Sequence, residues 1–289
     1  MQLKPDCLAC LYQQILRVTK VSNISEELAE DIMKDAAYTI AKDLPMKLTP
    51  PQAAAILYPK YYNLLKTDDP YRNIKKLSIK KAKELTKLVE SYIKNAKDQL
   101  DMALRVSTAG NVIDFASQKE YDLESEVTNI IDAQYAIDDK AILIERLKKS
   151  QNLLILADNS GEHIFDKLLL KTIKFHIPNI NIYYATRGVA IINDVTYQEA
   201  KESGIDEFAT IINSGVDTPC FLYERASKYM QKIYDNADTI IAKGMGNYEC
   251  MEMIEDKRLF FLMKIKCSVV AQNIKEPEGS LICKNSVNI

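Results

Sequence analysis

The chain has 289 residues and a formal net charge of −2, with 47% hydrophobic and 27% charged residues. This length fits one large domain or two smaller ones, and the composition is typical of a globular protein. The balanced charge gives no general attraction to nucleic acid or to anionic membranes, and no apolar run approaches the ~18 residues of a membrane helix. The N-terminus lacks the pattern of a signal peptide. We therefore expect a cytoplasmic protein that binds neither nucleic acid nor a membrane.

The N-terminal part of the chain is predicted to be helical. Residues 26–42 carry apolar side chains at helical spacing, with Ser25 as the expected N-cap. Residues 79–104 show the pattern of one long amphipathic helix. Proline-marked breaks are expected at Leu44–Pro51, Pro59 and Pro70. We expect a helical domain over residues 1–105 and an α/β domain over residues 106–289.

The cysteines do not indicate a disulfide scaffold, because six in a chain of this size are too few. Cys7 and Cys10 form a CxxC pair, but a zinc site would need two further ligands. We expect a reduced, partly buried pair, with a metal or redox role as the alternative. The other four are scattered along the chain, at Cys220, Cys250, Cys267 and Cys283.

From residue 150 onward, short apolar runs alternate with helical patterns. Strands are expected at Leu153–Ala157, Ile180–Ala185, Phe208–Ile212, Thr239–Ala242 and Leu259–Ile265. Helices are expected at residues 162–176, 195–203, 219–236 and 247–255. Such alternation predicts a doubly wound α/β fold with a mostly parallel sheet and helices on both faces.

Polar residues follow the first of these strands directly, in the run Asp158-Asn159-Ser160-Gly161-Glu162. This run stands where a buried strand ends and a helix begins, and ligands of open α/β sheets bind at that edge. A carboxylate and a carboxamide beside a glycine and a helix start suit a hard divalent cation and a phosphate.

Four further polar clusters follow the later strands. They are Arg187-Gly188 with Asn193-Asp194, Asn213 to Thr218, Lys243 to Glu249, and Lys266-Cys267. Because a right-handed doubly wound sheet gathers such strand ends on one edge, we expect all five clusters to lie together.

Each residue type in these clusters has a chemical reason to be there. Asp158, Asn159 and Asp194 offer oxygen ligands for a divalent cation harder than zinc. Lys243 and Arg187 are cations suited to phosphate. Glycines allow backbone N–H groups to approach an anion closely, at Gly161, Gly244 and Gly246.

Simpler interpretations stand beside each of these. Asp158-Asn159 and Asn193-Asp194 are both placed to cap the helices that follow, and each pair taken singly favours capping. Arg187 could be a surface charge, His163 a residue on a helix face, and Cys267 a buried small residue. The Gly-Met-Gly-Asn run fits a tight turn, and the dinucleotide fingerprint GxGxxG is absent.

Several motifs resemble the damage-control phosphatase family, first catalogued as domain of unknown function 89. They are DNSGEHIFDKLL (158–169), RGVAIINDV (187–195) and AKGMGNYE (242–249). The CxxC at residues 7–10, AGNVID (109–114), SGVDTP (214–219) and KCSVVA (266–271) are similar to its prokaryotic branch. The resemblance spans nearly the whole chain.

The resemblance implies a helical domain packed on a Rossmann-like α/β domain, and a metal-dependent phosphatase acting on small phosphorylated metabolites such as sugar phosphates or damaged phosphometabolites. It assigns the metal (magnesium, manganese, cobalt or nickel) to Asp158, Asn159 and Asp194, and a phosphate contact to Lys243. Asp158, Asp194 and Lys243 would be the catalytic residues. Substrate-binding positions would be Arg187, Glu162, Asn247, Lys243 and Gly161.

Two other functions stay open. Related eukaryotic proteins have been described as carboxyl methyltransferases, so the same resemblance also allows an S-adenosylmethionine-dependent carboxyl methyltransferase. The third hypothesis is a non-catalytic module that binds a metabolite or a metal. The sequence pattern sets no oligomeric state.

Overall fold

The computed structural model describes residues 1–112 and 123–287. The end of the AGNVID motif, Ile113-Asp114, lies outside the described residues. Within the described ranges, every helix is too short or too polar to cross a membrane.

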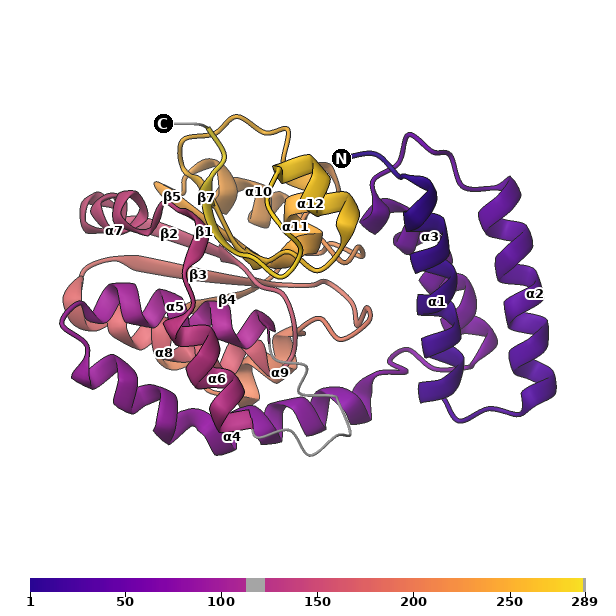
Figure 1. The fold of residues 1–289 in the computed structure, drawn as a ribbon, viewed down its shortest axis with the longest axis horizontal. Coiled ribbons are helices and arrows are strands. Elements are labelled where there is room, and N and C mark those ends of the chain that lie inside the picture. The colour runs from indigo at the N-terminus through magenta and orange to yellow at the C-terminus, as the bar shows by residue number, and fades with distance from the viewer. Residues whose placement is uncertain (113–122, 288–289) are drawn as a thin grey trace.

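The first three helices form a bundle with its own apolar core, set beside the α/β body (Figure 1). They are α1 (Pro5–Val21), α2 (Glu26–Lys42) and α3 (Pro50–Leu64). Ser25 caps α2 as expected, since its side chain accepts a hydrogen bond from the N–H of Leu28. The break expected at Pro59 is wrong, because Pro59 lies inside α3. Proline has no backbone N–H, so α3 loses one helical hydrogen bond at this position. Tertiary packing stabilises the helix enough to tolerate that loss.

The next two helices pack with the sheet rather than with the bundle. They are α4 (Arg72–Asn95) and α5 (Gln99–Val112), so the single helix expected over residues 79–104 is wrong. Asp98 causes the interruption, because its Oδ1 accepts hydrogen bonds from the N–H groups of Leu100 and Asp101, 3.0 and 3.1 Å away. A side chain that caps a new helix start in this way ends the previous helix. The bundle core is formed mainly by α1–α3, while most buried residues of α4 and α5 pack with the sheet, and the division of the chain at residue 105 stays a prediction.

A seven-stranded sheet forms the centre of the α/β body, in the order β1-β7-β6-β5-β2-β3-β4. Its strands are β1 (Tyr135–Asp138), β2 (Asn152–Leu156), β3 (Asn181–Thr186), β4 (Thr210–Asn213), β5 (Thr239–Lys243), β6 (Leu259–Lys264) and β7 (Leu281–Asn285). All neighbouring pairs are parallel except β6–β7, which is antiparallel. The predicted α/β class with a mostly parallel sheet is therefore confirmed.

Helices cover both faces of this sheet. One face packs on α4 and α5 together with α6 (Leu123–Asp132), α7 (Lys140–Lys149), α8 (Glu162–His176) and α9 (Tyr197–Glu202). The other face packs on α10 (Lys228–Asp235), α11 (Gly244–Met251) and α12 (Ser268–Ile274). Strand β2 alternates accordingly, with Leu153 and Ile155 in one core and Leu154 and Leu156 in the other. Two short 3-10 helices, η1 (Ile205–Glu207) and η2 (Tyr223–Arg225), complete the fold.

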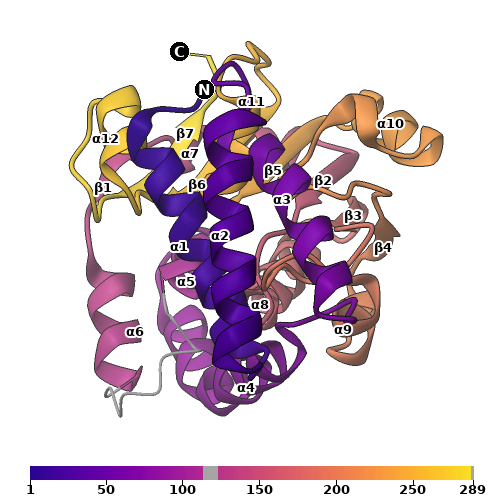
Figure 2. The ribbon, with the colours of Figure 1, turned by 90° about the vertical axis from the view of Figure 1, so that its right-hand side faces the viewer.

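The helix expected over residues 219–236 is shorter than its pattern indicated. The loop after β4 continues to η2, and α10 begins only after Ser227, whose side chain accepts a hydrogen bond from the N–H of Met230. The bundle of α1–α3 faces the edge of the sheet at which β2–β6 end, as the rotated view shows (Figure 2). Residues of four of the five expected polar clusters therefore line the space between the two parts of the molecule, whereas none from Asn213 to Thr218 is among its described lining residues.

Candidate active site between the helical bundle and the sheet edge

The turn after β2 presents Asp158 and Asn159 to a cavity rather than to a helix start. The N-cap of α8 is Gly161, with φ +98°, and no side chain caps this helix. Asn159 donates from Nδ2 to Oδ2 of Asp158 over 2.8 Å. The capping interpretation of Asp158-Asn159 is therefore wrong, and both side chains line the cavity.

The loop after β3 brings Asp194 to the same place. Asn159 and Asp194 form an isolated antiparallel bridge. The N–H of Val195 donates to the carbonyl of Asp158 over 2.9 Å, and that of Ser160 donates to the carbonyl of Asn193 over 2.8 Å. These backbone hydrogen bonds fix the positions of Asp158 and Asn159 relative to Asp194.

The capping interpretation of Asn193-Asp194 is also wrong. Helix α9 is capped by Thr196, which forms a capping box with Glu199. Glu199 further accepts a hydrogen bond from the hydroxyl of Ser160 at 3.0 Å and pairs with the buried Lys75 of α4 at 2.9 Å. One carboxylate thus connects both loops of the site to α4.

The two site carboxylates are buried, and their charge is only partly balanced. Asp158 is 8% exposed and Asp194 is 1% exposed. Burial, with the like charges of Glu162 and Asp194, raises the pKa of Asp158 to about 8. Burial also raises the pKa of Asp194, although Arg187 opposes this shift.

Arg187 is buried beside these carboxylates, so the surface-charge interpretation is wrong. Its Nε donates to Oδ2 of Asp194 over 2.6 Å, and its Nη2 lies 4.0 Å from Oδ1 of Asp158. Among the described residues, Oδ1 of Asp194 is buried and has no hydrogen-bond partner. A buried oxygen of this kind carries a free-energy cost that a cation would remove. With the carboxamide of Asn159, the donor set is hard and oxygen-rich and fits a divalent cation such as Mg²⁺ or Mn²⁺.

Gly244, the first residue of α11, lies directly beneath Asp158. It has φ +78°, and a Cβ built on it would lie 1.9 Å from Oδ2 of Asp158. Only glycine permits both the left-handed backbone and this close approach. The glycine run after β5 therefore shapes the floor of the site.

Lys243 lies in a buried ionic cluster below this floor and is not among the described residues that line the cavity. Its Nζ pairs with Asp166 at 2.5 Å and with Glu162 at 2.7 Å, and it donates to the hydroxyl of Ser107 over 2.7 Å. Burial alone would lower the pKa of Lys243, but the carboxylates of Asp166 and Glu162 outweigh burial and raise it. Lys243 thus forms an ion pair with Glu162 and does not itself line the described cavity.

Two other residues expected at the substrate have internal partners. Asn247 is fully buried; its Oδ1 accepts from the N–H of Phe221 over 2.7 Å, and its Nδ2 donates to the carbonyl of Lys243 over 2.7 Å. The N–H of Gly161 donates to Nδ1 of His163 over 3.2 Å. His163 lies on α8, as expected, with its side chain buried, and burial lowers its pKa to about 4.

The cavity has a volume of about 370 Å³ and lies between the bundle and the sheet edge. Its sheet side carries Asp158, Asn159, Ile192, Asp194, Pro219, Met245, Gly246, Glu249, Lys266, Cys267, Ser268 and Val269. Its bundle side carries Asp6, Cys7, Cys10, Leu11, Gln14, Pro50, Pro51 and Ala54. The wall is mainly apolar, and the only lysine or arginine among these described lining residues is Lys266. From the sequence, Lys266 was placed in a polar cluster after a strand but was not chosen as a phosphate-binding residue. Its position after β6 was the signal that could have identified it.

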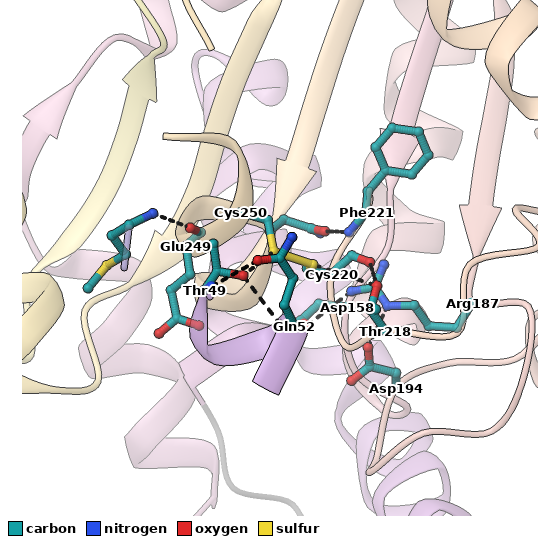
Figure 3. The surroundings of a disulfide bond; sticks show 12 residues. Thr49, Gln52, Asp158, Arg187, Asp194, Thr218, Cys220, Phe221, Glu249 and Cys250 are labelled. Carbon is teal, nitrogen blue, oxygen red and sulfur yellow. Dashed lines mark hydrogen bonds and ion pairs between the residues drawn. A yellow bond between two sulfur atoms is a disulfide. The ribbon is translucent and has the colours of Figure 1, made fainter. Parts of the chain in front are cut away.

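Three cysteines line this cavity, two form a disulfide beside it, and Cys283 is free and buried in β7. Cys7, Cys10 and Cys267 are outside any disulfide and line the cavity wall. Cys220 and Cys250 form a disulfide, which the scattered spacing did not indicate. It connects the loop after β4 to α11, next to Asp158, Arg187 and Asp194 (Figure 3). The two residues are 30 apart in sequence, and only the folded sheet edge brings them together.

Comparison with known proteins gives a consistent picture. Residues 3–282 match the family model described as the damage-control phosphatase ARMT1-like domain. The chain is 32% identical, over 98% of both chains, to a protein of Pyrococcus horikoshii named as a damage-control phosphatase. It is 27% identical to a protein of Archaeoglobus fulgidus with the same name, over 98% of this chain and 99% of that one.

An uncharacterised protein of Methanocaldococcus jannaschii is 30% identical over 94% of this chain and 92% of its own. The crystal structure of a DUF89 family protein from Pyrococcus horikoshii superposes with a TM-score of 0.93 at 32% identity. That match covers 99% of this chain and 100% of the other. The similarity thus extends over both the bundle and the sheet.

Proposed function

The chain belongs to the damage-control phosphatase ARMT1-like family, and on that premise we propose that it is a metal-dependent phosphatase of small phosphorylated metabolites. Sugar phosphates and damaged phosphometabolites are the substrate class we propose. The observation that carries the proposal is the pair of buried carboxylates, Asp158 and Asp194, of which Asp194 keeps one oxygen without a described partner.

The proposed metal ligands are Asp158, Asn159 and Asp194. A divalent ion bound there would polarise a phosphoryl oxygen and offset the repulsion between the two carboxylates. Arg187 donates a 2.6 Å hydrogen bond to Oδ2 of Asp194, which fixes the orientation of this carboxylate. Its other oxygen, Oδ1, is then the one available to a cation. A ligand held by a second residue keeps its orientation without the ion.

We assign the phosphate contact to Lys266 rather than directly to Lys243. Lys266 lines the cavity, and its charge acts on Asp158, whose pKa it lowers against the larger effect of burial. An ammonium group there neutralises a phosphate and the charge that develops on it during transfer. Lys243, with Glu162 and Asp166, supports the floor on which Asp158 rests.

The test is phosphate release by chelator-treated protein. We expect no release from p-nitrophenyl phosphate or a panel of sugar phosphates until Mg²⁺, Mn²⁺, Co²⁺ or Ni²⁺ is added. Equal release with and without metal would contradict the metal dependence. No release with any metal or substrate, combined with stabilisation by S-adenosylmethionine in chelator, would favour the methyltransferase instead.

A further inference from the structure

A tyrosine of the helical bundle contacts the backbone of the loop that carries Asp194. Tyr62 lies on α3 and is 7% exposed. Its hydroxyl oxygen accepts a hydrogen bond from the N–H of Ile192 over 3.0 Å. Ile192 precedes Asp194 by two residues, so the contact lies next to a proposed metal ligand.

The loop at this point has a backbone that its sequence does not favour. Ile192 has φ +41°, in the left-handed region, where a β-branched side chain is strongly disfavoured. The turn is closed by the N–H of Asp194, which donates to the carbonyl of Ile191 over 3.1 Å. A residue in this conformation persists only where its surroundings hold it.

The bundle supplies the surroundings that hold this turn. Ile191 is buried in the apolar core formed by α1–α3, and Ile192 packs against the same core. The N–H of Ile192 points into this contact, and the Tyr62 hydroxyl is the acceptor that the structure gives it. Without that oxygen, a backbone donor at the edge of an apolar core would have no acceptor, which favours opening of the turn.

We propose that Tyr62 is a positioning residue, which holds the 191–194 turn so that Asp194 is directed at the metal site before the ion arrives. This inference rests on the proposed function, because it takes Asp194 as a metal ligand. Burial raises the pKa of Tyr62, so its oxygen remains a neutral acceptor at working pH. The helical bundle thereby contributes to metal affinity through one hydrogen bond.

The neighbouring tyrosines of α3 offer a matched control. Tyr61 is also buried, but its hydroxyl donates to Asp35 of α2 over 3.0 Å, within the bundle. Tyr61→Phe removes the same atom from the same helix without a contact to the turn. A general weakening of the bundle would affect both variants, whereas positioning of Asp194 would affect Tyr62→Phe alone.

The experiment is a Mn²⁺ titration of chelator-treated full-length protein, read by calorimetry or electron paramagnetic resonance. We expect Tyr62→Phe to weaken Mn²⁺ binding by roughly 10- to 100-fold, as for other residues that orient a metal ligand. Tyr61→Phe is expected to bind Mn²⁺ like the wild type.

The outcomes separate the two proposals. If the wild type binds Mn²⁺ and Tyr62→Phe binds it equally well, the positioning role is overturned and the metal site stands. If the wild type itself does not bind, the metal site is overturned first. Should Tyr62→Phe fail to fold, amide hydrogen exchange by NMR on the metal-free wild type decides: protection of the Ile192 amide supports the inference, and rapid exchange overturns it.

Discussion

At the scale of single residues, the site is defined by charges that the fold forces together. Asp158 and Asp194 come from different loops, and Arg187 pairs closely with Asp194 and lies 4.0 Å from Asp158. Like charges in a buried place are stable only when a proton or a cation compensates them. For the same reason, burial and neighbouring carboxylates raise the pKa of Asp158.

Replacing one of these carboxylates is expected to abolish activity without lowering the stability of the fold. We expect Asp158→Ala to reduce metal-supported phosphate release to background, because the site loses a ligand. Its midpoint of thermal unfolding in chelator should equal or exceed that of the wild type, since the variant removes a buried carboxyl group whose ionised form the fold disfavours. Asp217→Ala is the control, because Asp217 is half-exposed on the same sheet edge and pairs with Arg225. Full activity in Asp158→Ala would contradict the assignment.

Gly244 tests the floor of the site. In Gly244→Ala, the new Cβ would lie 1.9 Å from Oδ2 of Asp158, so that carboxylate must move. We expect weaker Mn²⁺ binding and a loss of stability of about 1–3 kcal/mol from the left-handed backbone. Gly279→Ala is the control, because Gly279 also has positive φ but a Cβ added there would meet no atom within 4 Å. Equal Mn²⁺ affinity in the two variants would refute the steric argument.

Lys266 tests the phosphate contact. We expect Lys266→Met to lower kcat/KM for a phosphate ester by about tenfold or more, the value of a charge-assisted hydrogen bond, while Mn²⁺ affinity is retained. Lys264→Met removes the same charge two residues earlier, outside the described cavity lining, and should behave like the wild type. Steady-state kinetics with saturating Mn²⁺ measures both. Unchanged kinetics in Lys266→Met would show that another group binds the phosphate.

At the scale of elements, the parts of the fold that the sequence predicted are those with local causes. Strands β2, β3 and β5 each contain a continuous apolar run, as expected for strands in the interior of a parallel sheet. Helix α2 has the expected N-cap, Ser25, and helical spacing of its apolar residues, and α8 spans the predicted residues 162–176. Each of these is determined by residues close in sequence.

The elements that were missed depend on distant partners. Strand β7 pairs with β6 and β1, and β1 pairs only with β7 among the described strands. Four residues such as β1 (Tyr135–Asp138) carry too short a pattern to be distinguished from a loop. The structure brings together Asp158 and Asn159, which follow β2, and Asp194, which lies in the loop after β3, as their places after strands predicted. Tyr62 could not be selected in this way, since its contact joins α3 to a loop 130 residues away.

The cluster around Lys243 connects α5, α8 and β5, and its replacement tests an element-level role. Lys243→Met would leave Glu162 and Asp166 buried without their ammonium partner. We expect a loss of about 3–5 kcal/mol in the free energy of unfolding. Lys148→Met, which removes a lysine from an exposed pair with Glu145, should leave stability unchanged. If Lys243→Met instead keeps normal stability but no longer binds phosphate, Lys243 contacts the phosphate directly.

At the scale of the whole molecule, the cavity exists because the helical bundle closes the sheet edge. Residues of α1 and α3 form one wall, and the loops and helices that follow the strand ends form the other. Burial between these two parts also raises the pKa of Glu249 to about 8, since its carboxyl lies in the cavity wall. Stability of the metal-free protein should therefore depend on pH.

The direction of this dependence follows from proton binding. With folded-state pKa values of about 8, Asp158 and Glu249 hold protons that the unfolded chain releases near its ordinary values of 3.8 and 4.5. Stability is thus lost as pH rises toward 8. His163, with a folded-state pKa of about 4, acts in the opposite direction only below about 6.5. We expect the unfolding midpoint in chelator to fall between pH 6.5 and 8, and to fall less in Glu249→Gln. A midpoint that rises over this range would contradict the role given to burial.

The most direct test of the central claim is the position of the metal. Anomalous diffraction from crystals grown with Mn²⁺ locates the ion without reference to activity. We predict one strong peak within bonding distance of side-chain oxygens of Asp158, Asn159 and Asp194. A peak elsewhere, such as beside the thiols of Cys7, Cys10 and Cys267, with none at these oxygens, would contradict the proposed metal site.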